Sequence, residues 1–388
     1  MNNLPRARRL EDLQPFHVMK LLARARELEA AGRDIVHMEI GEPDFDTAAP
    51  IVEAGQAALA AGRTHYTPAT GLPALREAIA AHYAETSGIE VDSRRILVTP
   101  GASGALQLVL SAVVDPGRAV LMADPGYPCN RNFVRLLEAE AMSVPVGPEE
   151  GYQLTAEAVA GAWTERTVAV LAASPSNPCG TLLEADAIEA LHRTARAHGG
   201  VLILDEIYHG LTYSRAADTA LAVSDELFVV NSFSKYYGMT GWRLGWLVAP
   251  PSHVEALDVL AQNLFLAAPT VSQWAALAAF QPQTREILEA RREEFRRRRD
   301  FLLPALRALG FSVPVTPEGA FYIYADCSAL TDDSFAFSEA LLEETGVAVT
   351  PGIDFGCHRA REHLRFAYTT GLDRLEEGVE RIAHFLRR

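Results

Sequence analysis

The sequence predicts an α/β fold, with a large domain on a mostly parallel, doubly wound sheet and a smaller α+β domain. Short, continuously apolar runs bounded by turn residues are typical of strands buried on both faces of a parallel sheet. Helix-like segments lie between these runs, as crossover connections require. The length of 388 residues exceeds the size at which one hydrophobic core stops growing. We expect the large domain at 46–283 and the small domain at 1–45 together with 284–388.

The strands of the large domain are expected where apolar runs end in polar or turn residues. These runs lie at 95–99, 119–123, 167–172, 201–204 and 227–230. Helical apolar patterns follow at 106–114 and at about 185–198, and the second pattern ends at two glycines. Helices are therefore expected on both faces of the sheet.

The C-terminal part changes character. A long charged helix is expected at about 284–309 and two further helices at 334–344 and 372–386. Strands are expected at 320–324, 347–350 and 364–368. Strands and helices mixed in this way suit a small α+β domain.

The composition argues against several classes of protein. The formal net charge of −15 leaves no basic excess to neutralise phosphates, which argues against nonspecific nucleic-acid binding. The four cysteines lack CxxC spacing, as expected of reduced cytosolic thiols and not of a disulfide framework or a zinc site. No uncharged apolar stretch reaches membrane-spanning length, and the N-terminus lacks the apolar region of a signal peptide. We expect a soluble, cytoplasmic protein without a metal or a membrane anchor.

Lys235 is the most informative single residue. It follows the apolar run 227–230, hydroxyls flank it at Ser232 and Ser234, and Arg243 comes eight positions later. A lysine at the end of a buried strand can form a Schiff base as an amine nucleophile, while the neighbouring groups hold a phosphate. The alternative is a surface lysine whose charged head reaches solvent, which is the commoner situation for a lysine taken alone.

Two further segments place polar groups at the ends of apolar runs. Gly101-Ala-Ser-Gly104 precedes a helix and can present backbone N–H groups and the Ser103 hydroxyl to an anion, although such turns are common. Asp205 follows four apolar residues, so its carboxylate needs a cationic or hydrogen-bonding partner. A protonated ring nitrogen is one such partner, and a helix-capping role is the alternative. Because ligands bind outside the carboxyl ends of parallel strands, these groups are expected to face one crevice.

Asn177 and Arg365 complete the set of candidate polar residues. Asn177 precedes a proline, which holds it extended, and its amide can donate to an anionic oxygen; a structural turn is the alternative. Arg365 has apolar or aromatic neighbours on both sides and suits a bidentate grip on a carboxylate. An intramolecular ion pair is the alternative for Arg365.

Taken together, these segments resemble the class I/II aminotransferases, the fold-type I enzymes that use pyridoxal 5′-phosphate. The match covers nearly the whole chain in the family's order: Gly41-Glu-Pro-Asp-Phe45, Tyr66-Thr-Pro-Ala-Thr-Gly71, Gly101-Ala-Ser-Gly-Ala-Leu106, Asp124-Pro-Gly-Tyr127, Asn177-Pro-Cys-Gly180, Asp205-Glu-Ile-Tyr208, Ser232-Phe-Ser-Lys235, Gly241-Trp-Arg243 and Arg365. Each motif alone is weak, but the whole ordered series is highly specific.

The resemblance implies three catalytic residues. Lys235 holds the cofactor as a Schiff base and then moves a proton between the substrate Cα and the cofactor. Asp205 pairs with the pyridinium nitrogen, so that the ring can accept electrons. Tyr208 hydrogen-bonds the phenolic oxygen of the ring together with Asn177. The small domain is expected to close over this active site.

The resemblance also implies the remaining binding residues. Tyr127 stacks on the ring, and Tyr66 reaches the phosphate of the neighbouring subunit, which implies a homodimer with shared active sites. The substrate carboxylate is bound by Arg365, helped by Asn177 and the backbone at Gly41. The phosphate is held by Ser103, Ser232, Arg243 and the backbone at Ala102, and Gly101 and Ser234 also bind the cofactor.

The expected reaction is amino transfer from an L-amino acid to a 2-oxo acid such as 2-oxoglutarate or pyruvate. A C–S β-lyase on the same scaffold remains an alternative because it shares every residue above. A cofactor-binding regulatory protein is a remote one, because the cofactor motifs begin near Gly41 and leave no room for a DNA-binding module. The apolar segment 263–270, and Phe16 as a cover for the pocket, favour a neutral or aromatic amino donor.

Overall fold

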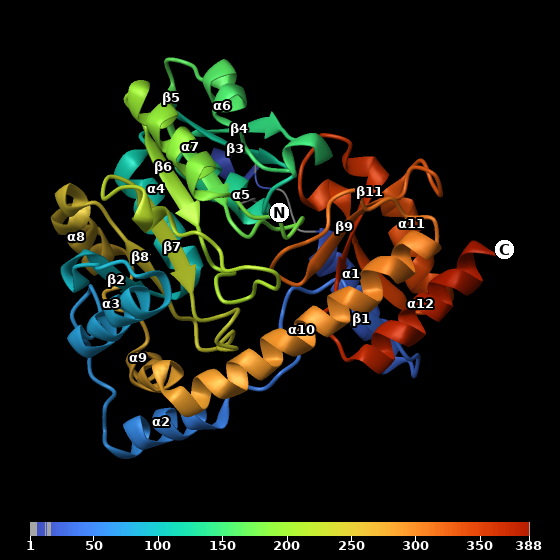
Figure 1. The fold of residues 1–388 in the computed structure, drawn as a ribbon, viewed down its shortest axis with the longest axis horizontal. Coiled ribbons are helices and arrows are strands. Elements are labelled where there is room, and N and C mark those ends of the chain that lie inside the picture. The colour runs from blue at the N-terminus through green and yellow to red at the C-terminus, as the bar shows by residue number, and fades with distance from the viewer. Residues whose placement is uncertain (1–5, 12, 14–16, 388) are drawn as a thin grey trace.

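Two sheets organise the chain in the computed structural model, which describes residues 6–11, 13 and 17–387 (Figure 1). The larger sheet has seven strands in the order β2-β8-β7-β6-β5-β3-β4. Only β8 runs antiparallel to its neighbours within this sheet, and the other pairs are parallel. Its strands are β2 (Ile96–Thr99), β3 (Ala119–Asp124), β4 (Glu140–Pro145), β5 (Thr167–Ala173), β6 (Val201–Asp205), β7 (Phe228–Ser232) and β8 (Gly245–Val248). The predicted α/β fold with a mostly parallel sheet is confirmed.

Helices cover both faces of this sheet. Alternate strand residues point to opposite sides, so that Leu121 and Val120 belong to two different apolar clusters. One cluster includes residues of α3 (Pro73–Ser87), α6 (Ala156–Ala162) and α7 (Ala185–Ala197). The other includes residues of α4 (Gly101–Val113), α5 (Pro128–Leu136) and α8 (Val254–Leu264). The continuous apolar runs of the sequence are therefore explained by burial on two faces.

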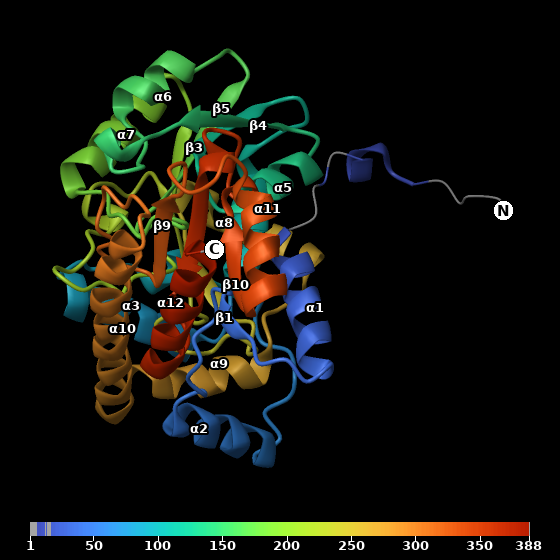
Figure 2. The ribbon, with the colours of Figure 1, turned by 90° about the vertical axis from the view of Figure 1, so that its right-hand side faces the viewer.

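The smaller sheet has four strands in the order β1-β10-β11-β9 and an apolar cluster of its own. Its strands are β1 (Val36–Met38), β9 (Tyr322–Asp326), β10 (Val347–Pro351) and β11 (His363–Ala367). Figure 2 faces this side of the molecule, where helices lie in front of the sheet and beside it. They are α1 (His17–Ala30), α10 (Pro282–Ala308), α11 (Ser334–Ala340) and α12 (Leu372–Leu386).

The long helix α10 connects the two parts of the molecule. It begins beside α2 (Ala49–Ala60) and α9 (Thr270–Ala276) and runs to the smaller sheet (Figure 1). No helix in the described ranges combines the length and the hydropathy that a membrane crossing requires.

Two predicted elements of the C-terminal part differ from the observed ones. The strand expected at 320–324 begins at Tyr322, because Ala320 has a positive φ of 58° that a strand cannot accommodate. The helix expected at 334–344 is α-helical only to Ala340 and continues as a π-helical turn to Thr345, where Gly346 ends it at a φ of 72°.

Candidate active site

Six of the residues predicted from the sequence line one cavity of about 220 Å³. Strands of the larger sheet lead to three of them, since β5, β6 and β7 end shortly before Asn177, Tyr208 and Lys235. The other three are Gly41, Tyr127 and Arg365. Arg365 lies in β11 and Gly41 follows β1, so the smaller sheet supplies part of the wall. The cavity thus joins groups from both sheets.

Lys235 lies in the turn after β7 and lines this cavity. Its Nζ donates a hydrogen bond of 2.7 Å to the carbonyl oxygen of Gly41. The ring centroids of Tyr208 and Phe321 lie 5.6 and 5.5 Å from Nζ. No carboxylate of the described residues forms an ion pair with this amine. The amine is therefore directed into the cavity and not toward bulk water.

Asp205 is the last residue of β6 and is only 3% exposed. Its carboxylate accepts a hydrogen bond of 3.1 Å from the backbone N–H of Ile207, and no cation of the described chain pairs with it. Burial raises the pKa of Asp205 to about 7, opposed by the Ile207 N–H and by the charge of Lys235. The chain after β6 forms turns and no helix, so Asp205 does not cap a helix. A cationic ligand group would stabilise its ionised form.

Arg365 is 5% exposed, and no described carboxylate pairs with it, which removes the ion-pair alternative. Its Nη1 donates to Asn177 Oδ1 at 3.0 Å, and its Nη2 donates to the carbonyl oxygen of Glu39 at 2.6 Å. Its Nε is buried without a hydrogen-bond partner among the residues described. Because arginine only donates, it holds the Asn177 oxygen and leaves the Asn177 amide N–H groups free to donate elsewhere. A buried, uncompensated guanidinium is suited to an anionic ligand.

The candidate phosphate residues form a second group, around Arg243 and the first turn of α4. A Cβ placed on Gly101, whose φ is 72°, would lie 2.6 Å from Arg243 Nη2, so only glycine permits this approach. Arg243 Nη1 donates to Ser234 Oγ at 3.5 Å, and Ser232 Oγ accepts from the Ser234 N–H at 3.0 Å. Ala102 and Ser103 belong to the first turn of α4, whose N–H groups lack partners within the helix. A guanidinium and a helix N-terminus together suit an anion.

Two tyrosines of the cavity keep their protons. Burial raises the pKa of Tyr208 well above its usual value, and the hydroxyl of Tyr322 acts in the same direction. Tyr208 Oη lies 3.0 Å from Tyr322 Oη. Burial also raises the pKa of Tyr127, whose hydroxyl lies 3.3 Å from Cys129 Sγ. Both tyrosines can therefore donate a hydrogen bond to a ligand at neutral pH.

One predicted site residue lies apart from these groups, and another is outside the part of the chain that the structure describes. Tyr66 lies between α2 and α3 and is 82% exposed. Phe16 lies outside the described residues.

The sequence reasoning missed four lining residues that take part in the site. Tyr322 and Phe355 flank Arg365, with ring centroids 4.2 and 4.8 Å from its Cζ. Met19 lies at the cavity in α1, and Asp354 accepts hydrogen bonds from the first backbone N–H groups of that helix at 2.7 and 2.8 Å. These residues carry no local sequence signal, because only the packing of distant segments brings them to this cavity.

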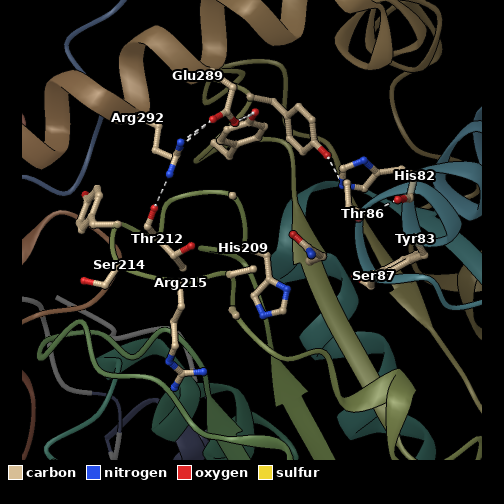
Figure 3. Close-up of a pocket in the computed structure, with 17 residues that line it drawn as sticks. His82, Tyr83, Thr86, Ser87, His209, Thr212, Ser214, Arg215, Glu289 and Arg292 are labelled. Atoms are coloured by element: carbon tan, nitrogen blue, oxygen red, sulfur yellow. Dashed lines mark hydrogen bonds and ion pairs between the residues drawn. The ribbon is translucent and has the colours of Figure 1, made fainter.

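A larger cavity, of about 360 Å³, is lined in part by Tyr236 and Tyr237 and by none of the predicted site residues (Figure 3). Several of its polar groups are paired with one another, although His82 Nδ1 and His209 Nε2 are buried without a partner among the described residues. Tyr236 Oη donates to Glu289 Oε1 at 2.6 Å, and Arg292 Nη1 donates to the Thr212 carbonyl oxygen at 3.0 Å. The cavity that holds Lys235 and Arg365 is therefore the candidate active site.

Comparison with known proteins agrees with this geometry. The family model described as aminotransferase class I and II matches residues 33–382. The chain is 39% identical to the valine–pyruvate aminotransferase of Mycobacterium tuberculosis, over 96% of each chain. It is 38% identical to the aspartate/prephenate aminotransferase of Thermus thermophilus, over 98% of this chain and 99% of the relative.

Solved structures give the same result. A crystal structure of an aminotransferase from Mycobacterium tuberculosis superposes with a TM-score of 0.96 at 38% identity, covering 99% of this chain and 100% of the other. The aspartate aminotransferase from Thermus thermophilus with maleate gives a TM-score of 0.92 at 37% identity, covering 99% and 100%. This chain belongs to the class I and II aminotransferase family.

Proposed function

We propose that this aminotransferase uses pyridoxal 5′-phosphate and moves the amino group of a neutral or aromatic L-amino acid to 2-oxoglutarate or pyruvate. One observation carries the proposal. A buried carboxylate, Asp205, and a buried guanidinium, Arg365, both lack an ion-pair partner among the described residues. Arg365 and the amine of Lys235 line the same cavity, and the charge of Lys235 acts on Asp205. A positively charged ring nitrogen and a substrate carboxylate would supply the two missing charges.

The residues present fit the proposed cofactor. Asp205, whose ionised form is disfavoured by burial, would pair with the protonated ring nitrogen. Asn177 and Tyr208 would donate to the phenolic oxygen, and Tyr127 would stack on the ring. The phosphate would be held by Gly101, Ala102, Ser103, Ser232, Ser234 and Arg243. When bound, pyridoxal phosphate supplies an electron-accepting ring that stabilises negative charge at the substrate Cα.

Lys235 has two roles in this proposal. Its Nζ would hold the cofactor covalently until the substrate amine replaces it. The released amine would then take the proton from the substrate Cα and deliver it to the cofactor. The Gly41 carbonyl oxygen, 2.7 Å from Nζ, is an acceptor that orients the amine in the cavity.

The residues that line the cavity favour an amino donor whose side chain carries no charge. Arg365, with Asn177 and the backbone at Gly41, would bind the α-carboxylate. Lys235 and Arg365 are the only cations among the described lining residues, and the lining also includes the carboxylates Glu39 and Asp354. The wall also includes the apolar side chains of Met19 and Phe355. The named relatives include one that acts on valine and pyruvate and one that acts on aspartate or prephenate, so substrate choice must come from this lining.

We further propose a cytosolic homodimer in which each subunit completes the other's site. Support comes from Tyr66, whose 82% exposure leaves it free to reach a partner's phosphate site. Leu264 and Leu266 are also exposed, at 52% and 45%, as is common at subunit interfaces. The four cysteines are free thiols, which suits a reducing compartment. The part built from 1–45 and 284–388 would close over the cavity, because it carries Gly41 and Arg365.

Two experiments test the proposal. Borohydride treatment of the yellow protein should attach the cofactor to Lys235, and labelling of another lysine would refute that role. A panel of amino donors with 2-oxoglutarate and pyruvate should then yield keto acid and a new amino acid. Release of ammonia with pyruvate, and no amino acid product, would instead favour the C–S β-lyase.

A further inference from the structure

Tyr322 contacts three of the predicted site residues, although the sequence marks it only as part of a strand. It is 1% exposed, and its Oη lies 3.0 Å from Tyr208 Oη. Its ring centroid lies 4.2 Å from Arg365 Cζ. A Cβ on Gly41 would lie 1.8 Å from Tyr322 Oη, so the hydroxyl occupies the space that any side chain at position 41 would need. Tyr322 thus lies where cofactor and substrate groups meet.

The contact between the two hydroxyls constrains the direction of their protons. A tyrosine hydroxyl has one proton to donate, and at 3.0 Å one of the two donates to the other. Tyr322 is the only hydrogen-bond partner of the Tyr208 hydroxyl among the described residues. Tyr208 can therefore donate to a ligand only if it accepts from Tyr322. Accepting one hydrogen bond also strengthens the bond that a hydroxyl donates.

The contact with Arg365 constrains the guanidinium. The rings of Tyr322 and Phe355 both lie within 5 Å of its Cζ, at 4.2 and 4.8 Å. Aromatic rings attract a guanidinium and favour stacking against its flat face, so its N–H groups are presented along the edges. A substrate carboxylate would accept its hydrogen bonds from the N–H groups along those edges.

We propose that Tyr322 is a positioning residue that directs the Tyr208 proton toward the cofactor's phenolic oxygen and orients Arg365 for the substrate carboxylate. The inference rests on the proposed function, because it presumes a cofactor oxygen beside Tyr208. The two contacts use different parts of the side chain. The hydroxyl acts on Tyr208 and the ring acts on Arg365, so substitutions can separate them.

The first measurement is the pH midpoint of the absorbance change of the bound cofactor. A donor to the phenolic oxygen stabilises its deprotonated form, so a weaker donor raises the midpoint. Tyr322→Phe is expected to raise the midpoint by about half to one pH unit. Tyr322→Met, which also lacks the hydroxyl, should raise it similarly, and Tyr208→Phe should raise it at least as far.

The second measurement is the dissociation constant of the enzyme for 3-phenylpropionate, a monocarboxylate without an amino group. Tyr322→Met removes the ring and should weaken binding by about three- to tenfold. Tyr322→Phe keeps the ring and should bind the acid within about twofold of the wild type.

Tyr324→Phe is the matched control, because Tyr324 is a buried tyrosine of the same strand whose ring stacks on His363 instead. Tyr324→Phe should change neither the pH midpoint nor the dissociation constant for 3-phenylpropionate. A midpoint shift equal to that of Tyr322→Phe would overturn the inference. An unmoved midpoint in Tyr322→Phe, with a raised one in Tyr208→Phe, would refute the role of Tyr322 and leave the proposed function intact. An unmoved midpoint in Tyr208→Phe would refute both.

Discussion

Replacing Asp205 by Asn is expected to stabilise the cofactor-free protein at pH 8 while it weakens cofactor binding. Burial raises the pKa of this carboxyl from 3.8 to about 7. Between these two values the unfolded chain has lost the proton that the folded protein still holds. The unfolded state binds fewer protons there, so the free energy of unfolding falls as the pH rises. Asparagine does not titrate and avoids this loss.

The magnitude follows from the shift. A pKa unit corresponds to about 1.4 kcal/mol, so the shift of about 3 units costs about 4 kcal/mol of stability above pH 7. About 3 kcal/mol of this cost develops between pH 5 and pH 8. In the wild type, a protonated ring nitrogen beside Asp205 would offset this loss of stability, so cofactor binding depends on the ionised carboxylate.

The assay is urea unfolding of the two cofactor-free proteins at pH 5 and pH 8, at one protein concentration. The stability of Asp205→Asn relative to the wild type should rise by about 3 kcal/mol between these pH values. An equal difference at both pH values would refute the reasoning. Glu206→Gln is the control, because Glu206 is fully buried with a pKa raised to about 8, but its carboxylate accepts hydrogen bonds from the Thr219 hydroxyl and the Ala220 N–H instead. It should share the pH effect on stability and retain cofactor affinity.

Three other substitutions test separate parts of the site. Arg365→Lys keeps the positive charge but loses the planar guanidinium that can bind a carboxylate with two hydrogen bonds. The kcat/KM for the amino donor should therefore fall about 10- to 100-fold, while the cofactor spectrum stays unchanged. A loss of less than threefold would contradict the role of Arg365 in binding the substrate carboxylate. Gly101→Ala introduces a Cβ 2.6 Å from Arg243 Nη2 at a φ of 72°, and should weaken cofactor binding and lower the Tm of the cofactor-free protein by several degrees. Tyr66→Phe should raise the dissociation constant of the cofactor. In mixed dimers of Tyr66→Phe and Lys235→Ala subunits, sites that bind the cofactor tightly should be restored. Failure to restore them would argue against sites shared between subunits.

Part of the site could be predicted because residues that directly follow strands in the sequence also meet at one edge of a parallel sheet. Asn177, Asp205 and Lys235 each follow a continuous apolar run, and parallel strands bring their carboxyl ends to one edge. The motif order then identified the family from the sequence. The boundaries of β9 and α11 were predicted less well, because a positive φ at Ala320 and a π-helical turn leave no pattern of apolar residues.

The sequence by itself determined the α/β class, the family, and the residue types at the carboxyl edge of the larger sheet, because these depend on local runs and short motifs. Only the tertiary structure decided what surrounds Arg365. Antiparallel pairing of β9 with β11 places Tyr322 opposite Ala367, diagonal to Arg365, and the segment after β10 brings Phe355 to the same guanidinium. That register depends on the packing of segments far apart in the chain, so no spacing within the sequence encodes it. The same packing leaves Arg365 and Asp205 buried without ion-pair partners in the described part of the chain, and this is the physical basis for expecting ligands there.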